Sequence, residues 1–422
     1  MVQTGTTAGA SPIDDAHSWR GEFLLRLLGA LLQILATCAV VRALIPEEVG
    51  IYFRGFVIAL GLSTPLRGKY EIFMAQHIIG RRAALTGIPD RVLLQQLARR
   101  VLLRSSLLCG VLLVVTADLD IQAPQLQTML QTYLPFVLAI PCVSLAGFLG
   151  EALRAANRTL GIVMAAYAVN QSMLLAFALA PRHASLMFYS WAFFLGSLVS
   201  LALAAALARR AFPLAPGENT QPLRVQALHG IDSRELVGIA RGLLLWGPLC
   251  VLAVWAPPIQ MAQYAVAVRT ALIVDILLPA LNLTGYRETL SSKPAQSSRP
   301  LLLKQLVAAL LYSSGLVIPL WVLAPATLAL YGVPYDSQMT VYALLLGVQW
   351  SNGLGRPAVR QAVVDWNAQR IGFAVGAGAL AVVLISALGV HAYGALAAAA
   401  ASLIGALIFN GCAIGIAVAR PM

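Results

Sequence analysis

Uninterrupted apolar stretches of about 20 residues recur along this chain of 422 residues, from Phe23 to Val418,. About 20 residues of α-helix cross a hydrocarbon core of roughly 30 Å, so each stretch is long enough to span a bilayer. Hydrophobic residues make up 59% of the chain and charged residues 11%, against roughly 45–50% and 25% in soluble domains. The sequence therefore predicts an all-α polytopic membrane protein.

The distribution of charge predicts how the spans cross the membrane. Arginine collects in the even-numbered connections, as at Arg81 and Arg209, whereas the odd-numbered connections are short and mainly acidic, as at Glu47. By the positive-inside rule, both termini and every even-numbered connection are expected in the cytoplasm. The net charge of +12 thus indicates topology and, secondarily, attraction to anionic lipid headgroups; no nucleic-acid partner is expected. About twelve spans are expected, at 23–43, 51–79, 101–117, 130–152, 159–180, 185–208, 236–256, 260–286, 302–324, 338–359, 369–388 and 392–418.

The polar segments argue against an enzyme. Each connection is shorter than about 30 residues, and a small folded domain usually needs at least roughly 40–50. The chain lacks the G-x-x-x-x-G-K-[ST] phosphate-binding loop, and its five cysteines and five histidines are scattered without the spacing of metal ligands,. We therefore expect a transporter without a cofactor or metal, driven by a gradient or by a partner.

Two similar segments predict an internal repeat. "PEEVGIYFRGFVIAL" at Pro46–Leu60 and "PPIQMAQYAVAVRTALIV" at Pro257–Val274 each place a proline, a short turn and a tyrosine before an apolar helix that carries an arginine. The connection at 209–235, with its Pro, Gly and Asn, is the expected cytoplasmic linker between a six-helix lobe at 1–208 and a second at 236–422,. Six spans give both lobes the same orientation, which implies a parallel repeat with a substrate site between the lobes.

Three stretches carry a resemblance to a known family: "LLGALLQILATCAVVRALIPEEVGIYF" at Leu27–Phe53, "LLLWGPLCVLAVWA" followed by "MAQYAVAVRTALIV", and "LALYGVPYDSQMTVYALLLGVQWSNGLG" at Leu328–Gly355. They resemble polysaccharide flippases of the O-antigen type, within the multidrug/oligosaccharidyl-lipid/polysaccharide (MOP) exporter superfamily. The resemblance implies two six-helix lobes around a central cavity, in the inner membrane of a bacterium. The "RGKYE" of the second span has no counterpart among the motifs of the family, and twelve rather than fourteen spans disfavour a lipid II flippase.

The same resemblance implies a cargo and partners. Members of the family move an undecaprenyl-pyrophosphate-linked oligosaccharide from the cytoplasmic to the outer leaflet by alternating access, and some couple this movement to a cation gradient. The implied partners are this lipid-linked substrate, the surrounding membrane lipids, a polysaccharide polymerase and a chain-length regulator.

The second expected span contains charges that its apolar surroundings do not explain, in the segment Thr64–Phe73. Arg67 lies roughly 25 Å from the outer end of this helix, beyond Pro65, which is expected to kink it. Arg67 and Glu71 are four residues apart, so they share a helix face and can pair, whereas Lys69 points elsewhere. Either the segment lines a cavity, or it bends early toward the cytoplasmic headgroups with Lys69 extended to them.

Further charges lie in other spans. Arg269 is roughly 13 Å deep, too far from either interface to reach it comfortably. Asp275 lies about 120° around the same helix and is a poor partner for Arg269. Both are candidates for a functional or gating role. Arg26 and Arg54 lie nearer an interface, where each either lines the cavity or extends toward headgroups.

Cations outnumber carboxylates in this set, which favours an anionic cargo because guanidinium groups bind phosphate oxygens through paired, charge-assisted hydrogen bonds. A cation-coupled multidrug exporter of the same superfamily, the first alternative, is expected to show the opposite sign. A polysaccharide polymerase or ligase, the second alternative, needs a large outer loop, and the outer connections here have about 15 residues or fewer. The expected cargo-binding residues are Arg26, Arg54, Arg67, Lys69 and Arg269, and the expected coupling or gating residues are Glu71 and Asp275.

Overall fold

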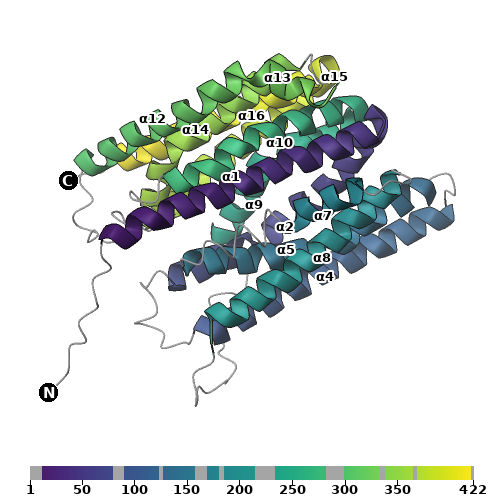
Figure 1. Cartoon of the computed structure of the whole chain (residues 1–422), viewed down its shortest axis with the longest axis horizontal. Helices are drawn as coiled ribbons and strands as arrows, with labels where there is room; N and C mark the ends of the chain where they lie inside the picture. The colour runs from purple at the N-terminus through teal and green to yellow at the C-terminus, as the bar shows by residue number, and fades with distance from the viewer. Residues whose placement is uncertain are drawn as a thin grey trace.

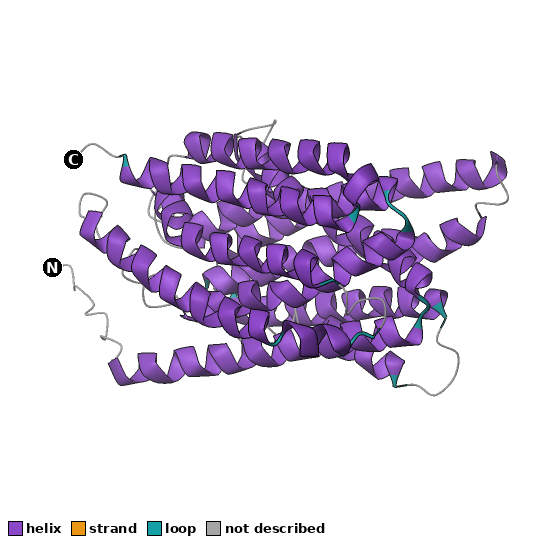
Figure 2. Cartoon of the chain, turned by 90° about the horizontal axis from the view of Figure 1, so that it is seen from above, coloured by secondary structure: helices purple, strands orange, loops and turns teal. Residues whose placement is uncertain are grey.

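The computed structural model describes residues 12–78, 90–122, 127–156, 169–179, 185–213, 233–281, 299–332, 338–364 and 368–419. Every regular element within these residues is a helix, which confirms the all-α prediction, and Figure 2 shows long helices side by side. The helices are α1 (Pro12–Ala43), α2 (Pro46–Ile78), α4 (Asp90–Gln122), α5 (Gln127–Ala155), α7 (Val169–Ala178), α8 (Leu186–Ala211), α9 (Ser233–Trp255), α10 (Pro258–Leu281), α12 (Arg299–Val322), α13 (Ala324–Ala329), α14 (Met339–Val364), α15 (Ala368–Tyr393) and α16 (Ala395–Val418).

The helices account for the expected spans. Eight of those in the described residues are long and apolar enough to cross a membrane, on α1, α2, α5, α8, α10, α12, α15 and α16. Two shorter apolar helices, Val169–Ala178 and Gly242–Trp255, fall on the fifth and seventh expected spans. The two remaining spans, 101–117 and 338–359, fall on α4 and α14. The protein is a multi-pass membrane protein.

Local sequence determines where the first two helices meet. α1 ends at Ala43 and α2 begins at Pro46, followed in its first turn by Glu47 and Glu48. Proline suits the first position of a helix because its φ is already helical and the missing amide hydrogen needs no partner there. Carboxylates in the first turn interact favourably with the positive end of the helix dipole. The sequence therefore starts a second long helix immediately after the first.

α2 continues through the charged segment of the sequence to Ile78, with Pro65 inside it. The side chain of Lys69 is only 1% exposed, so it is enclosed by protein. A lysine that reached out to headgroups would be exposed at the protein surface. This burial contradicts the part of the alternative in which Lys69 extends to the headgroups, whereas an early bend of the segment toward the cytoplasmic headgroups stays a prediction.

One large hydrophobic cluster connects the two halves of the chain at one end of the molecule. It combines buried residues of α1, α2, α5, α7 and α8 with buried residues of α9, α10, α14, α15 and α16. A Cβ atom on Gly50 would collide with the carbonyl of Pro258, so the starts of α2 and α10 touch through their backbones. We call this the joined end.

At the opposite end each half has a hydrophobic cluster of its own. Residues of α2, α4, α5 and α8, including Tyr70 and Leu93, form one cluster. Residues of α12, α14, α15 and α16, including Ile371 and Ala413, form the other. We call this the split end, and the positive-inside prediction places it at the cytoplasmic surface. Figure 1 shows the corresponding groups of helices, α4, α5, α7 and α8 below and α10, α12, α14, α15 and α16 above.

Two helices of the first half pack across the boundary between the groups. α1 contacts both α7 and α10, and it runs along α10 in Figure 1, while α2 contacts α9 and α10. α8 ends at Ala211 and α9 begins at Ser233, so the expected linker at 209–235 lies mostly outside the described residues. The division into lobes at 1–208 and 236–422 stays a prediction.

Candidate functional site

Arg269 of α10 lies at the contact between the two halves and is only 7% exposed. Its Nε donates to Oγ1 of Thr37 on α1 at 2.9 Å, and its Nη2 donates to Oε1 of Gln171 on α7 at 3.2 Å. The Thr37 hydroxyl in turn donates to the carbonyl of Gln33 at 2.7 Å, which leaves its lone pairs free to accept from the guanidinium. Gln33 closes the set, because its Nε2 donates to the backbone carbonyl of Arg269 at 2.8 Å.

Aromatic rings of α2 cover the remaining face of this guanidinium. The ring centroid of Phe56 lies 4.6 Å from the Arg269 guanidinium carbon, and that of Phe53 lies 5.9 Å away. No ion pair involves Arg269 within the described part of the chain. Neutral acceptors and rings stabilise a guanidinium without cancelling its charge. Arg269 is therefore a buried, uncancelled positive charge that ties α10 to α1, α2 and α7.

Arg26 and Arg54 also reach across the boundary between the halves, and both donate to backbone carbonyls. Nη1 of Arg26 on α1 lies 3.2 Å from the carbonyl oxygen of Ile276 on α10, and the arginine is buried. Nη2 of the half-buried Arg54 on α2 lies 2.6 Å from the carbonyl oxygen of Ala256, immediately after α9. Carbonyls at the end of a helix carry partial negative charge and attract cations. Both arginines thus contact the opposite half.

Arg67 and Glu71 form the ion pair that their spacing predicts. Nε of Arg67 and Oε1 of Glu71 are 3.2 Å apart, and each side chain is 22% exposed. The Arg67 guanidinium also lies against the backbone of α5, because a Cβ atom on Gly147 would collide with it. A glycine at this position of α5 therefore creates the space that the arginine fills.

Two further cations lie near this pair in the sequence or the packing. Lys69 is buried two residues after Arg67. Arg104 of α4 places its guanidinium carbon 5.2 Å from the ring centroid of Tyr70 on α2. Arg104 was not among the predicted residues, although an arginine within a predicted span was a sufficient signal.

Asp275 pairs with a residue that the sequence analysis also missed. Its Oδ1 accepts from Nη2 of Arg356 on α14, and the side chains are 43% and 25% exposed. Asp275 directly precedes Ile276, whose carbonyl accepts from Arg26. Arg356 stands inside the tenth expected span, and its position there could have indicated its role.

A short segment after α13 covers the joined end. The Tyr331 hydroxyl lies 2.9 Å from Oγ1 of Thr270 on α10, and the carbonyl of Leu330 accepts from Nε of Arg42 at 2.8 Å and from Sγ of Cys38 at 3.1 Å. Burial raises the pKa of Tyr331 to about 12, so its hydroxyl remains protonated near neutral pH,. The segment thus connects α10 to α1 through hydrogen bonds.

The structure does not gather the seven expected residues into one site. Arg26, Arg54 and Arg269 lie at contacts between the halves; Arg67 and Glu71 lie between α2 and α5; Asp275 lies between α10 and α14. Over the described residues, no group of three or more His, Cys, Asp or Glu side chains is arranged to hold a metal ion. The site offers several cations, of which Arg54 and Arg269 donate to neutral oxygen atoms.

No protein-family model and no curated protein sequence matches this chain. Solved structures match it over nearly its whole length. A multidrug resistance MATE family transporter of the MOP superfamily, in an inward-facing conformation, has a TM-score of 0.61 at 12% identity, covering 94% of this chain and 98% of the other. The chain has the fold of MOP-superfamily transporters.

Two further structures show the same fold with other described properties. A MOP superfamily transporter from Pyrococcus furiosus, described as having a binding pocket of reverse polarity, matches with a TM-score of 0.60 at 14% identity, over 94% of this chain and 93% of the other. The lipid II flippase MurJ matches with a TM-score of 0.58 at 11% identity, over 94% and 87% of the two chains. At these identities the likeness concerns the fold, which confirms the expected MOP-like architecture.

Proposed function

We propose that this protein is a flippase of a bacterial inner membrane with both termini in the cytoplasm. Its cargo is an undecaprenyl-pyrophosphate-linked oligosaccharide, moved from the cytoplasmic to the outer leaflet by alternating access for the synthesis of a surface polysaccharide. A polysaccharide polymerase and a chain-length regulator would act on the product. The proposal depends on one observation, the excess of positive charge within the membrane-spanning helices.

The excess lies in the number of cations, and two of the cations are paired with carboxylates. In the described residues, Glu71 forms an ion pair with Arg67, and Asp275 forms an ion pair with Arg356. Arg269 is bound instead to a hydroxyl, an amide oxygen and aromatic rings. The charges within the expected spans are the cations Arg26, Arg42, Arg54, Arg67, Lys69, Arg104, Arg241, Arg269, Lys304, Arg356 and Arg370 against the carboxylates Glu71, Glu151 and Asp275.

Such charges are costly, because an arginine at the centre of a bilayer raises the free energy of insertion by about 2.5–3.5 kcal/mol. A chain that keeps several of them needs a use for them. A pyrophosphate group brings two negative charges and many acceptor oxygens, which guanidinium groups bind in paired geometry. The charge set supports an anionic cargo and disfavours a cationic drug.

The packing supports movement of one half against the other. A shared hydrophobic cluster holds the halves at the joined end, whereas separate clusters stabilise each half at the split end. With the split end toward the cytoplasm, this arrangement corresponds to a transporter closed to the outside. Release of the cross-half contacts of Arg54 and Arg269 would accompany opening to the other side.

Reconstitution tests the proposal. The protein in liposomes is expected to speed the movement of a fluorescent undecaprenyl-pyrophosphate oligosaccharide between leaflets, measured by loss of fluorescence to a membrane-impermeant reductant. A fluorescent cationic dye serves as the competing substrate. Transport of the dye without movement of the pyrophosphate lipid would establish the multidrug-exporter alternative and reject the flippase.

A further inference from the structure

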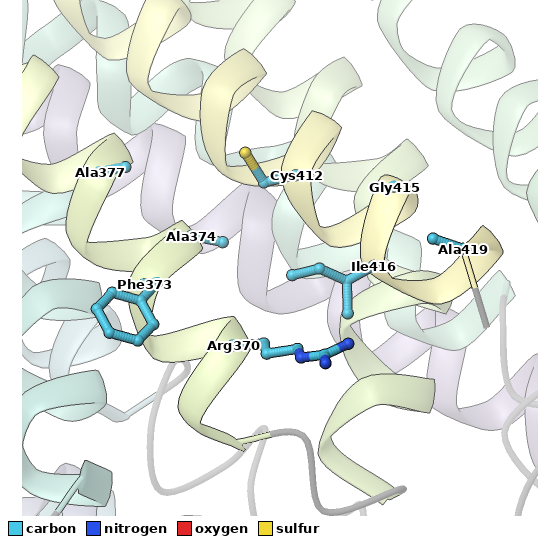
Figure 3. A pocket seen from close by; sticks show the side chains of 8 residues that line it. All are labelled: Arg370, Phe373, Ala374, Ala377, Cys412, Gly415, Ile416 and Ala419. Carbon is cyan, nitrogen blue, oxygen red and sulfur yellow. The ribbon is translucent and has the colours of Figure 1, made fainter. Parts of the chain in front are cut away.

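An open groove lies between α15 and α16 near the split end. It has a volume of about 530 Å³ and is lined by Arg370, Phe373, Ala374, Ala377, Cys412, Gly415, Ile416 and Ala419. Figure 3 shows that these residues come from two adjacent helices, with Arg370 extending beneath Ile416. All the lining residues except Arg370 are apolar or small.

The depth and direction of the groove follow from the antiparallel helices. Arg370 and Ala419 lie toward the split end, and Ala377 and Cys412 lie deeper in the bilayer. The seven steps along the helix from Arg370 to Ala377 rise roughly 10 Å. Arg370 is the first residue of the apolar span Arg370–Tyr393, so its guanidinium is at the level where headgroups meet acyl chains. The groove therefore runs from the headgroup level into the hydrocarbon region.

Small residues make the groove, and exposed apolar residues border it. A Cβ atom on Gly415 would meet no other heavy atom within 4 Å, so the space beside this glycine is open. The ring of Phe373 is 74% exposed and stands at the rim. A hydrocarbon chain fits this surface, since an open apolar groove within a bilayer is filled by lipid.

Charge decides which lipid is favoured. Arg370 is exposed at the polar end of the groove, and within the described residues no carboxylate pairs with it. It also lies in the first turn of α15, where the helix dipole is positive,. Both features attract an anionic headgroup and give a zwitterionic one no comparable gain. A basic residue beside an apolar groove is the arrangement that selects acidic lipids at a membrane surface.

We propose that this groove binds an anionic phospholipid, with one acyl chain between α15 and α16 and the phosphate group on Arg370. The site lies on the outer surface of the second half, away from the cross-half contacts of Arg269, and it does not depend on the proposed cargo. One basic residue at a membrane surface corresponds to a preference of about fivefold for the acidic lipid.

Native mass spectrometry of the full-length purified protein measures this preference. Phosphatidylglycerol and phosphatidylcholine with the same acyl chains are titrated against the protein, and the first bound lipid is quantified. We expect the wild type to prefer phosphatidylglycerol about fivefold. Arg370→Gln is expected to abolish the preference, and Gly415→Leu to remove the bound lipid by filling the open space.

Two matched variants separate the site from general effects. Arg210→Gln removes an exposed arginine from the last turn of α8, also at the split end, and Gly315→Leu fills open space beside an exposed glycine of α12. Both are expected to bind lipid like the wild type. Equal preference in the wild type and in Arg370→Gln would overturn the proposal.

Photocrosslinking places the lipid on the protein. Phosphatidylglycerol with a diazirine on its acyl chain is expected to label peptides that contain residues 370–377 and 412–419. Uniform labelling of all lipid-facing helices would reject a specific site. A polyprenyl phosphate that carries a diazirine is tested in the same way, in competition with phosphatidylglycerol. If it labels the groove and phosphatidylglycerol does not displace it, the groove binds the cargo, and the phospholipid proposal is rejected. If the wild type forms dimers and Gly415→Leu does not, the groove is an interface between two copies of the protein. This result would also reject the phospholipid proposal.

Discussion

Removal of the acceptor that holds Arg269 is expected to open the joined end. In Thr37→Val the side chain keeps its shape but loses the oxygen that accepts from Nε of Arg269 at 2.9 Å. A hydrogen bond to a charged group contributes about 1.5–3 kcal/mol in proteins. Cross-helix hydrogen bonds measured in membranes contribute less, about 0.6 and at most about 1.7 kcal/mol.

We therefore expect Thr37→Val to destabilise the joined arrangement by about 1–2 kcal/mol, a change of about 5- to 30-fold in its population relative to an open one. Arg269→Ala removes two hydrogen bonds and the contact with Phe56, and it is expected to cost about 2–4 kcal/mol. The two variants should thus shift the same equilibrium, with the larger shift for Arg269→Ala.

Pulsed electron–electron double resonance tests this shift by measuring the distance between two spin labels, one on each half at the joined end. Leu179 follows α7 and Tyr393 ends α15, and both are well exposed, so cysteines at these positions accept labels without disturbing the core. The native exposed cysteines, Cys250 and Cys412, are replaced first. Longer label distances are expected in Thr37→Val and still longer ones in Arg269→Ala.

A second threonine provides the control. Thr327 on α13 is half-buried and bonds only to the carbonyl of Leu323 four residues before it, so Thr327→Val removes no hydrogen bond between helices. Its distance distribution should equal that of the wild type. If Arg269→Ala is folded and also retains the wild-type distances, the reasoning that Arg269 holds the halves together is refuted.

Two further predictions concern the ion pairs. Gly147→Ala should displace the Arg67 guanidinium from α5 and lower the melting temperature slightly, with a loss of about 1 kcal/mol, because the new methyl group takes space that the end of this flexible side chain fills. Gly150→Ala meets open space and should melt like the wild type in a thermal-shift assay. Asp275→Asn should lower the melting temperature, because it leaves Arg356 without its carboxylate partner,. The double variant Asp275→Asn with Arg356→Gln should recover most of that loss. Equal melting temperatures of the single and double variants would show that the pair does not couple α10 to α14.

The sequence predicts much of the fold because its signals are local. Apolar length gives the spans, and the proline and glutamates at Pro46–Glu48 start α2,. The spacing of Arg67 and Glu71 gives their ion pair, since residues four apart share a face of one helix,. Each of these inferences needs only the geometry of a single helix.

The partners of Arg269 could not be predicted in this way. Thr37 and Gln171 lie on helices distant in sequence, and neither carries a charge that would mark it as a partner. The position of Arg356 within a span marks it as a candidate, but its pairing with Asp275 could not be predicted, because the ion pair forms only when α14 packs against α10. Contacts between helices depend on crossing angles and rotations that the pattern of one span does not determine.

The kind of partner that each arginine has bears on what it can do. A carboxylate partner cancels the charge of Arg67 and of Arg356, so an anion entering the protein would have to compete with a fixed negative charge,. Arg54 and Arg269 instead contact carbonyl, hydroxyl and amide oxygens across the boundary between the halves. When the halves separate, these neutral acceptors withdraw and the guanidinium groups need new ones. A phosphate group supplies negatively charged acceptors, so an anionic cargo would stabilise the separated state more than the joined one. A cationic cargo would be repelled by the same groups in the same state, and this difference is why the sign of the charge, rather than the fold, favours a flippase.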